Sequence, residues 1–228
     1  MQIEIIPTIL VKNFEEVKEK IKQVENLVDW VQLDIMDGVF VNNETWDNPK
    51  DLKKIKTKLK LEAHLMVQKP EEVIDDWLEV VDRVIIHFES KITNRELGIR
   101  GMIEKAHKRG KQIGLAINPE TPIDVVRSYI STKRSDQPSE QSERSTILDI
   151  VLCMAVQPGL GGQEFKYWVL KKIEILRRLW PSGNIEVDGG INPETAKKTI
   201  KAGANLICAG TYIFRSKDIE KAIESLKI

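Results

Sequence analysis

The stretch Val31-Gln32-Leu33-Asp34-Ile35-Met36-Asp37-Gly38 decides the fold, because it is an apolar strand that ends in a carboxylate and a tight turn. Three later segments end in the same manner. They are Leu61-Glu62-Ala63-His64-Leu65-Met66, Ala155-Val156-Gln157-Pro158-Gly159-Leu160-Gly161-Gly162 and Asn184-Ile185-Glu186-Val187-Asp188-Gly189-Gly190. Strands that stop at a polar group before a loop are typical of the active-site face of an α/β barrel. The repeated pattern predicts such a face here.

Short apolar runs alternate with longer amphipathic stretches along the whole chain. We expect strands near Glu4–Ile9, Trp30–Ile35, Leu61–Leu65, Arg83–His87, Gln112–Ala116, Asp149–Met154, Asn184–Val187 and Asn205–Ala209. Helix start signals lie at Asn13, at Pro70-Glu71-Glu72 and at Asn192-Pro193. Eight strand–helix units in 228 residues predict one α/β domain over 1–228, a (β/α)8 TIM barrel. A doubly wound open sheet is the alternative that strand counting leaves open.

One polar stretch interrupts this alternation. Residues at about 131–146 lack apolar periodicity, and we expect a disordered loop there, on the barrel face opposite the site. His107 lies in an amphipathic stretch and is expected to face solvent.

The bulk composition excludes several classes of protein. Lys plus Arg and Asp plus Glu are both 35, which gives no electrostatic sign of a nucleic-acid or membrane partner. No apolar run approaches the roughly 20 residues that span a bilayer. The first residues lack the basic region and apolar core of a signal peptide, so a cytoplasmic protein is expected. Cys153 and Cys208 lie in apolar runs and are predicted to be small core residues.

The polar strand ends predict a common site. In a barrel, Asp34, His64 and Asp188 converge on one cavity, joined by Gln32 two residues before Asp34 on the same strand face. Two carboxylates and an imidazole around one point are typical of a divalent cation site, and the carboxylates can also transfer protons. The alternative is that each is only a polar strand end. His87 is expected to support this ring from behind, together with Glu89.

Glycines at the last three strand ends predict an anion site. Gly161 and Gly162 follow the sixth strand, Gly190 follows the seventh, and Gly210-Thr211 follow the eighth. Loops after strands 7 and 8 are the usual phosphate position of a TIM barrel. Three methionines, Met36, Met66 and Met154, lie near the same strand ends and either line a sugar pocket or belong to the ordinary core.

In these residues the chain resembles the ribulose-phosphate 3-epimerase family, nearly from end to end. The motifs that carry the resemblance are Pro7-Thr8-Ile9-Leu10, Leu33-Asp34-Ile35-Met36-Asp37-Gly38, His64-Leu65-Met66-Val67, His87-Phe88-Glu89, Asn118-Pro119-Glu120-Thr121-Pro122, Gln157-Pro158-Gly159-Leu160-Gly161-Gly162-Gln163-Glu164-Phe165 and Val187-Asp188-Gly189-Gly190-Ile191. This ordered series is specific for the family, and it favours the ribulose-phosphate-binding type of TIM barrel over the open sheet.

The resemblance implies an isomerase of the pentose phosphate pathway that inverts C3 of D-ribulose 5-phosphate to give D-xylulose 5-phosphate. It implies that Asp34 and Asp188 transfer the protons, and that one divalent metal ion (Zn, Mn, Fe, Co or Mg) stabilises the enediolate. The metal ligands would be Asp34, His64, Asp188 and, as the doubtful one, Gln32. The phosphate would rest on Gly161, Gly162, Gly190, Gly210 and Thr211, and Thr8, Met36, Met66 and Met154 would contact the sugar. A homo-oligomer, dimer or hexamer, is implied by resemblance alone.

Three departures from the family pattern stand near the expected site. Gln32 replaces a histidine, Thr8 replaces a serine, and Val39-Phe40-Val41-Asn42-Asn43 lacks the His and Pro of the family loop. An amide oxygen is a poorer ligand than imidazole for zinc-like ions. Three outcomes are therefore open: a weakly held and harder metal ion, a metal-free site that uses the two carboxylates, or binding without turnover.

Two functional alternatives follow from these departures. One is a hexulose-phosphate 3-epimerase, for example for allulose 6-phosphate, since the altered loop could admit one more carbon. The other is a catalytically impaired phosphosugar-binding paralogue. A nucleotide-binding module is disfavoured, because Ile9-Leu10-Val11-Lys12 stands where a glycine-rich fingerprint would follow the first strand.

Overall fold

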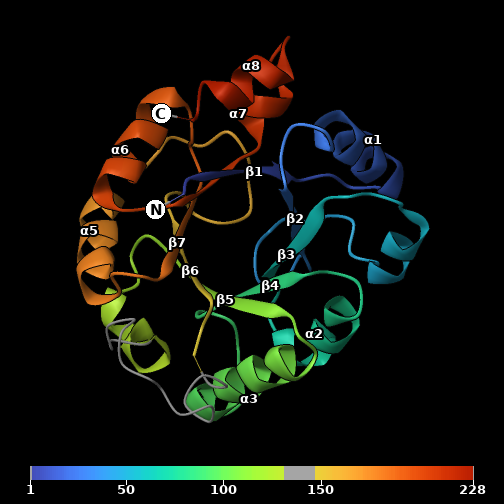
Figure 1. Ribbon diagram of the computed structural model, residues 1–228. Coiled ribbons are helices and arrows are strands. Elements are labelled where there is room, and N and C mark those ends of the chain that lie inside the picture. The colour runs from blue at the N-terminus through green and yellow to red at the C-terminus, as the bar shows by residue number, and fades with distance from the viewer. Residues whose placement is uncertain (1, 131–146, 228) are drawn as a thin grey trace.

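Eight parallel strands form a closed barrel in the computed structural model, which describes residues 2–130 and 147–227. Each strand pairs with the next in chain order, and the last pairs with the first (Figure 1). The strands are β1 (Glu4–Ile9), β2 (Trp30–Met36), β3 (Lys60–Met66), β4 (Arg83–His87), β5 (Gln112–Ile117), β6 (Ile150–Met154), β7 (Asn184–Asp188) and β8 (Leu206–Ala209). The closed order confirms the TIM barrel and rules out the doubly wound sheet.

Helices follow the strands and surround the barrel (Figure 1). They are α1 (Phe14–Val24), α2 (Pro70–Leu78), α3 (Arg95–Lys108), α5 (Val169–Leu179), α6 (Pro193–Ala202), α7 (Thr211–Phe214) and α8 (Ile219–Glu224), with 3-10 helices η1 (Pro49–Lys54) and η2 (Ile123–Tyr129). The three predicted helix starts are confirmed. The side chains of Asn13 and Asn192 accept hydrogen bonds from the first-turn N–H groups of α1 and α6, and Pro70 opens α2.

Two hydrophobic cores result from the alternation of side chains along each strand. Outward-facing strand residues pack against the helices in one large cluster. A smaller cluster fills the barrel interior and contains Ile6, Trp30, Ile85, Ala116, Ile150, Leu152, Met154, Val156, Leu206 and Cys208. Polar residues share this interior in two levels, because Gln32 pairs in register with Glu62, and Asp34 with His64. The level of Asp34 is nearer the carboxyl ends of the strands.

Several details differ from the sequence-based expectations. Strand boundaries shift by one residue at most. The predicted polar loop at about 131–146 lies outside the described residues. The expectation that His107 faces solvent is wrong, because its ring is partly buried and its Nε2 lies 2.9 Å from Asp149 Oδ2. Cys153 and Cys208 are buried, as predicted, and neither forms a disulfide. Among the described helices, none has the length and apolar character to cross a membrane.

Candidate functional site

Four polar side chains meet at the carboxyl ends of β2, β3 and β7. His64 Nδ1 lies 3.1 Å from Asp34 Oδ1 and 3.9 Å from Asp188 Oδ2. The amide nitrogen of Gln32 lies 2.8 Å from Asp34 Oδ1 and 3.3 Å from His64 Nδ1. The same nitrogen donates to Asp188 Oδ2 at 3.3 Å. The structure therefore brings together Gln32, Asp34, His64 and Asp188, from strands far apart in the sequence. These four residues are called the polar ring below.

The ring is buried, and its groups perturb one another. Burial and the neighbouring charge of Asp34 raise the pKa of Asp188 from an ordinary 3.8 to about 7, against the opposing effect of His64. Burial by itself lowers the pKa of His64, but the hydrogen bond and charge of Asp34, with the charge of Asp188, outweigh it and raise that pKa. The site therefore keeps Asp188 protonated until near-neutral pH, and it favours the charged form of the His64 imidazole.

His87 and Glu89 stand behind the ring, as predicted. His87 Nε2 lies 2.9 Å from His64 Nε2, and the two rings stack with centroids 5.0 Å apart. Burial lowers the pKa of His87 to about 4, so its ring is neutral at pH 7 and can accept a hydrogen bond from His64. On its other side, His87 Nδ1 lies 3.3 Å from Glu89 Oε2. This chain of contacts fixes the orientation of His64.

The donor set of the ring fits a divalent cation. Single ligand atoms of Asp34, His64 and Asp188 all lie within 4.8 Å of one another. Two ligand atoms bound at about 2.0–2.2 Å lie at most about 4.4 Å apart. The distances of 3.1 and 3.9 Å from His64 Nδ1 to Asp34 Oδ1 and Asp188 Oδ2 meet this limit. One imidazole and two carboxylates suit zinc, iron or manganese. These three residues are therefore the candidate metal ligands, and Gln32 stands where a fourth would be.

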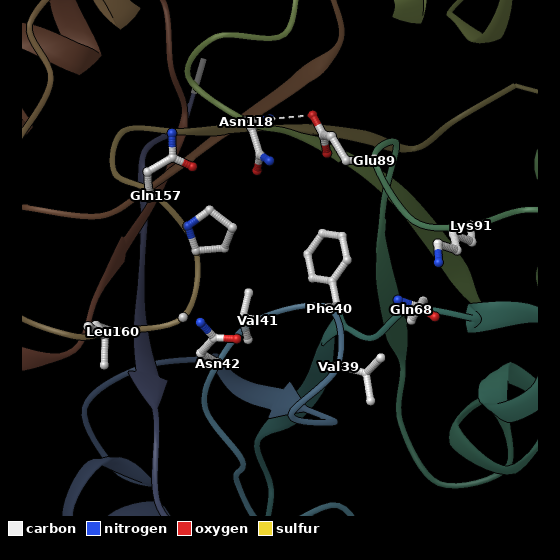
Figure 2. Close-up of a pocket in the computed structure, with 12 residues that line it drawn as sticks. Val39, Phe40, Val41, Asn42, Gln68, Glu89, Lys91, Asn118, Gln157 and Leu160 are labelled. Carbon is white, nitrogen blue, oxygen red and sulfur yellow. Dashed lines mark hydrogen bonds between the residues drawn. The ribbon is translucent and has the colours of Figure 1, made fainter.

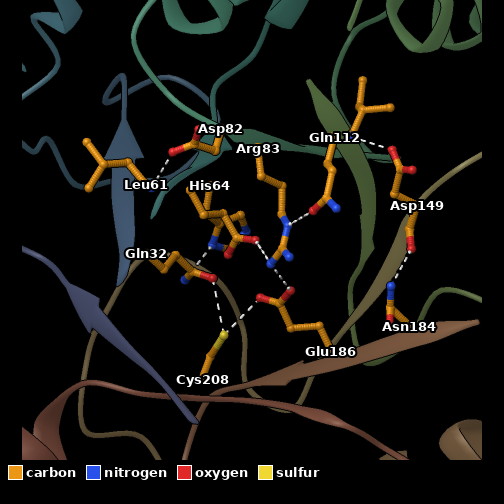
Figure 3. A network of polar contacts seen from close by, with 12 residues as sticks. Gln32, Leu61, His64, Asp82, Arg83, Gln112, Asp149, Asn184, Glu186 and Cys208 are labelled. Carbon is orange, nitrogen blue, oxygen red and sulfur yellow. Dashed lines mark hydrogen bonds and ion pairs between the residues drawn. The ribbon is translucent and has the colours of Figure 1, made fainter. Parts of the chain in front are cut away.

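A second polar cluster lies one level deeper in the barrel (Figure 3). Arg83 Nη1 donates to Glu62 Oε2 at 2.7 Å and lies 3.7 Å from Glu186 Oε2. Cys208 Sγ lies 2.8 Å from Glu186 Oε1 and 3.3 Å from Gln32 Oε1. Glu62, Glu186 and Cys208 are close enough to hold a cation. However, Arg83 already supplies the positive charge, and burial keeps the pKa of the Cys208 thiol well above its ordinary value. This cluster fits a buried ion pair better than a metal.

Sequence reasoning does not single out Glu62, Arg83 and Glu186. A signal was present, because Glu62 stands two residues before His64 and Glu186 two residues before Asp188, as Gln32 stands before Asp34. Residues two apart on a strand face the same side. The same spacing on three strands predicts a second inward-facing polar level.

The predicted phosphate residues line one cavity of about 580 Å³ together with the ring carboxylates. Gly161, Gly162, Gly190, Gly210 and Thr211 are on its wall, as are Thr8, Met36, Met66 and Met154. Gly162 and Gly190 have left-handed backbone conformations, with φ of +77° and +65°. Within the described residues, the N–H groups of Gly161, Gly162 and Gly190 donate to no other protein group. Unpaired N–H groups around a hollow can bind an anion. The roles of these residues remain predictions.

A further pocket of about 580 Å³ adjoins this cavity across the loop Gln157–Leu160 (Figure 2). The altered loop after β2 forms one of its walls, and Phe40 points inward over His87, with ring centroids 4.9 Å apart. Asp37 holds this loop by accepting hydrogen bonds from the N–H groups of Val39 and Phe40. The loop therefore has a defined structure without the His and Pro of the family pattern.

Comparisons with known proteins agree with this geometry. A family model described as "Ribulose-phosphate 3 epimerase family" matches residues 4–214. Ribulose-phosphate 3-epimerase of Schizosaccharomyces pombe is 32% identical, with 100% of this chain and 93% of the relative covered. The chloroplastic ribulose-5-phosphate-3-epimerase of Arabidopsis thaliana is 34% identical, with coverages of 99% and 76%. Ribulose-phosphate 3-epimerase of Bacillus subtilis is 33% identical, with coverages of 99% and 98%.

Solved structures share the fold at lower identity. A 3-hexulose-6-phosphate synthase superposes with a TM-score of 0.68 at 16% identity and covers 98% of both chains. KGPDC from Streptococcus mutans gives a TM-score of 0.70 at 12% identity, with 100% of this chain and 96% of the neighbour covered. At these identities the likeness shows the barrel alone. The family match and the relatives above 30% identity show more: the chain belongs to the ribulose-phosphate 3 epimerase family, whose members are isomerases.

Proposed function

We propose that the protein interconverts D-ribulose 5-phosphate and D-xylulose 5-phosphate by proton transfer at C3. One observation carries the proposal: Asp34 and Asp188 approach the same point from β2 and β7, in a cavity whose other wall has glycine N–H groups that donate to no other group among the described residues. Inversion of a carbon centre needs a proton acceptor on one face and a proton donor on the other. Two carboxylates from different strands supply both.

The protonation state of the pair supports this role. A two-base epimerisation requires one ionised and one protonated carboxyl group at the same time. In the metal-free site, a pKa of about 7 for Asp188 keeps its protonated form available at neutral pH. A catalytic pKa near the working pH gives efficient proton transfer in both directions. Asp34 then removes the C3 proton while Asp188 delivers one, and the roles exchange in the reverse reaction.

The other ring residues serve charge and position. Asp34, His64 and Asp188 are the residues that would hold a divalent metal ion. When bound, such an ion supplies Lewis-acid stabilisation of the negative charge that develops on the C2 oxygen. In the metal-free site, protonated His64 would supply the positive charge near that oxygen in place of the ion, and its raised pKa favours this form. The buried thioethers of Met36, Met66 and Met154 exclude water from the reacting carbon.

The phosphate end of the substrate lies at the loops after β6, β7 and β8. Glycine N–H groups there bind phosphate oxygens, and Gly210-Thr211 open α7 behind them. The distance from these loops to the ring fixes C3 between the carboxylates. Thr8 lies beside Gly210, and its hydroxyl is available to the sugar.

The test is deuterium incorporation at C3 of D-ribulose 5-phosphate in deuterated water. The protein is assayed as purified, after chelation, and after addition of manganese or zinc. We expect exchange and D-xylulose 5-phosphate formation that depend on the metal. Exchange that survives chelation would instead support a metal-free pair of carboxylates. Absence of exchange under every condition, in protein that binds the sugar phosphate by calorimetry, would favour a phosphosugar-binding paralogue.

A hexulose 6-phosphate is the second candidate substrate, and the adjoining pocket is the observation that favours it. Its lining includes hydrogen-bonding side chains from Gln68, Asn118 and Gln157, which suit the additional hydroxyl group that a hexulose 6-phosphate has between C3 and its phosphate. The ratio of kcat/KM for D-ribulose 5-phosphate and D-allulose 6-phosphate decides between the two. A higher value for the hexulose would replace the pentose assignment.

A further inference from the structure

The amide of Gln32 occupies the fourth corner of the candidate metal site. The side chain is fully buried, and its nitrogen contacts the ligand atoms of Asp34, His64 and Asp188 at 2.8, 3.3 and 3.3 Å. An amide nitrogen has two protons and no free lone pair for a metal, whereas the amide oxygen can coordinate one. The end of the amide that faces the ring is therefore the end that binds carboxylates.

The opposite end of the amide has a partner that accepts either atom. Gln32 Oε1 lies 3.3 Å from Cys208 Sγ, as Figure 3 shows. A thiol both donates and accepts weak hydrogen bonds. The single S–H proton of Cys208 can go to the amide oxygen, or it can go to Glu186 Oε1 at 2.8 Å while the sulfur accepts from the amide N–H₂ group. The two ends of a carboxamide also have nearly the same size, so half a turn about Cγ–Cδ exchanges them within the same buried volume.

We propose that Gln32 is a reversible metal ligand. Without an ion, its N–H₂ group bridges Asp34 and Asp188 and holds the two carboxylates together. When a divalent ion binds, the amide turns by half a turn, its carbonyl oxygen becomes the fourth protein ligand, and its N–H₂ group faces Cys208. The inference rests on the proposed function in that it concerns the same site, but it concerns metal binding and not turnover.

The exchange explains how one substitution alters the metal chemistry without loss of the site. In the metal-free state the amide protons offset the repulsion between two carboxylates in a buried place. In the loaded state a neutral, hard oxygen replaces the imidazole of the family pattern. Oxygen ligands suit Mn²⁺ and Mg²⁺, whereas imidazole suits Zn²⁺ and Fe²⁺. The ion must also displace two hydrogen bonds to carboxylates, so the site binds its ion less tightly than a site with histidine at this corner.

The first test compares Mn²⁺ affinity in the whole protein by competition with a chelating dye. Gln32→Met keeps the length of the side chain and removes its oxygen. We expect this variant to bind Mn²⁺ at least about ten-fold more weakly, a loss typical of metal-site residues. Equal or tighter binding would overturn the proposal, because it would show that the amide only competes with the ion. Cys208→Ala is the matched control: it removes the hydrogen bond at the other end of the amide in both states, and we expect less than about three-fold change.

A second measurement is made on the wild-type protein, and a variant serves only to assign one resonance. The side-chain carbonyl carbon of Gln32 is observed by ¹³C NMR and assigned by its absence from Gln32→Met, or from Gln32→Glu where the first variant does not fold. Titration with diamagnetic Mg²⁺ should shift this resonance in step with occupancy of the site. A resonance that stays unchanged while the ion binds would overturn the proposal. Neither experiment involves turnover, so failure of the epimerase assignment leaves both readouts intact.

Discussion

The two halves of the cavity are lined by different chemical groups. The half at β6, β7 and β8 presents backbone N–H groups from loops whose glycines have unusual conformations. The half at β2, β3 and β4, together with the Asp188 carboxyl group at the end of β7, presents buried side chains, each in contact with the next. Backbone groups are the same in every residue type, whereas one changed side chain alters the charge and ligand set of its half. Gln32 shows this difference, since a single residue changes how an ion can bind while the cavity keeps its walls.

The largest expected effect belongs to the side-chain half. Asp188→Asn removes the carboxyl group that exchanges a proton and keeps its size. We expect kcat/KM and C3 deuterium exchange to fall by about 10³-fold, within the range for loss of a general acid–base group. Binding of the sugar phosphate, measured by calorimetry, should persist because the N–H groups of the other half remain. Glu194→Gln, at an exposed carboxylate in the first turn of α6, is the control and should be fully active. An active Asp188→Asn would refute the two-base mechanism.

The second prediction concerns the backbone half and compares two glycines. A Cβ atom at Gly190 would lie 2.6 Å from Phe165 N, and φ there is +65°. A Cβ atom at Gly161 would meet only Thr211 Oγ1, at 3.3 Å. We expect Gly190→Ala to lower the free energy of unfolding by about 1–3 kcal/mol and to raise KM at least ten-fold. Gly161→Ala should change KM by only a few-fold.

Steady-state kinetics with the sugar phosphate and urea unfolding measure both effects. Equal KM values for the two alanine variants would show that the loops hold the phosphate through something other than their backbone conformation. The claim that backbone conformation determines phosphate binding in the half at β6, β7 and β8 would then be wrong.

The sequence predicted the backbone half and the ring better than it predicted the deeper level. Strand ends and glycine clusters are local patterns, so Asp34, His64, Asp188 and Gly190 could all be placed from them. A Glu within an apolar strand has no predictable role from the sequence until its partner is known. Arg83 reaches Glu62 across adjacent strands, and no local pattern contains that contact.

Two other features depend on tertiary contacts alone. The direction of the Gln32 amide depends on contacts across the barrel, with Asp188 and with Cys208, which comes 176 residues later in the chain. His107 lies on α3, and its Asp149 partner stands just before β6. An amphipathic pattern predicts which face of a helix is exposed, but it does not predict which polar group of another element contacts a residue at the edge of that face. Both features therefore required the folded structure.

The third prediction returns to the side-chain half and asks how far one residue changes it. Gln32→His replaces the amide with an imidazole at the fourth corner of the ring. We expect this variant to bind zinc at least about ten-fold more tightly than the wild-type protein, because imidazole is the better ligand for that ion. Competition with a chelating dye measures the affinity, and metal analysis after dialysis measures retention. Gln68→His, at the adjoining pocket outside the ring, is the matched control and should retain no extra zinc. Equal retention in both variants would mean that position 32 does not contribute to the ligand set.

The smallest effect concerns stability and pH in chelated protein. The pKa of Asp188 is about 7 when folded and near 3.8 when unfolded, because burial and Asp34 disfavour its charge. The unfolded chain therefore loses this proton first as pH rises, and wild-type stability falls relative to Asp188→Asn between about pH 4 and pH 7. Well below a pH of 3.8 both states hold the proton and the difference vanishes.

The whole difference between the folded and unfolded pKa values of Asp188 corresponds to a loss of about 4 kcal/mol in the free energy of unfolding of the wild type. Gln32 also loses a hydrogen bond to an ionised partner in the variant. We therefore expect Asp188→Asn to gain on the order of 2 kcal/mol at pH 8 relative to its difference from wild type at pH 4. Urea unfolding of both proteins at pH 4 and pH 8 measures this change in relative stability. A difference that does not change with pH would show that the carboxyl group ionises as freely in the fold as in the unfolded chain. The side-chain half would then lack the mutual perturbation that distinguishes it from the half made of backbone.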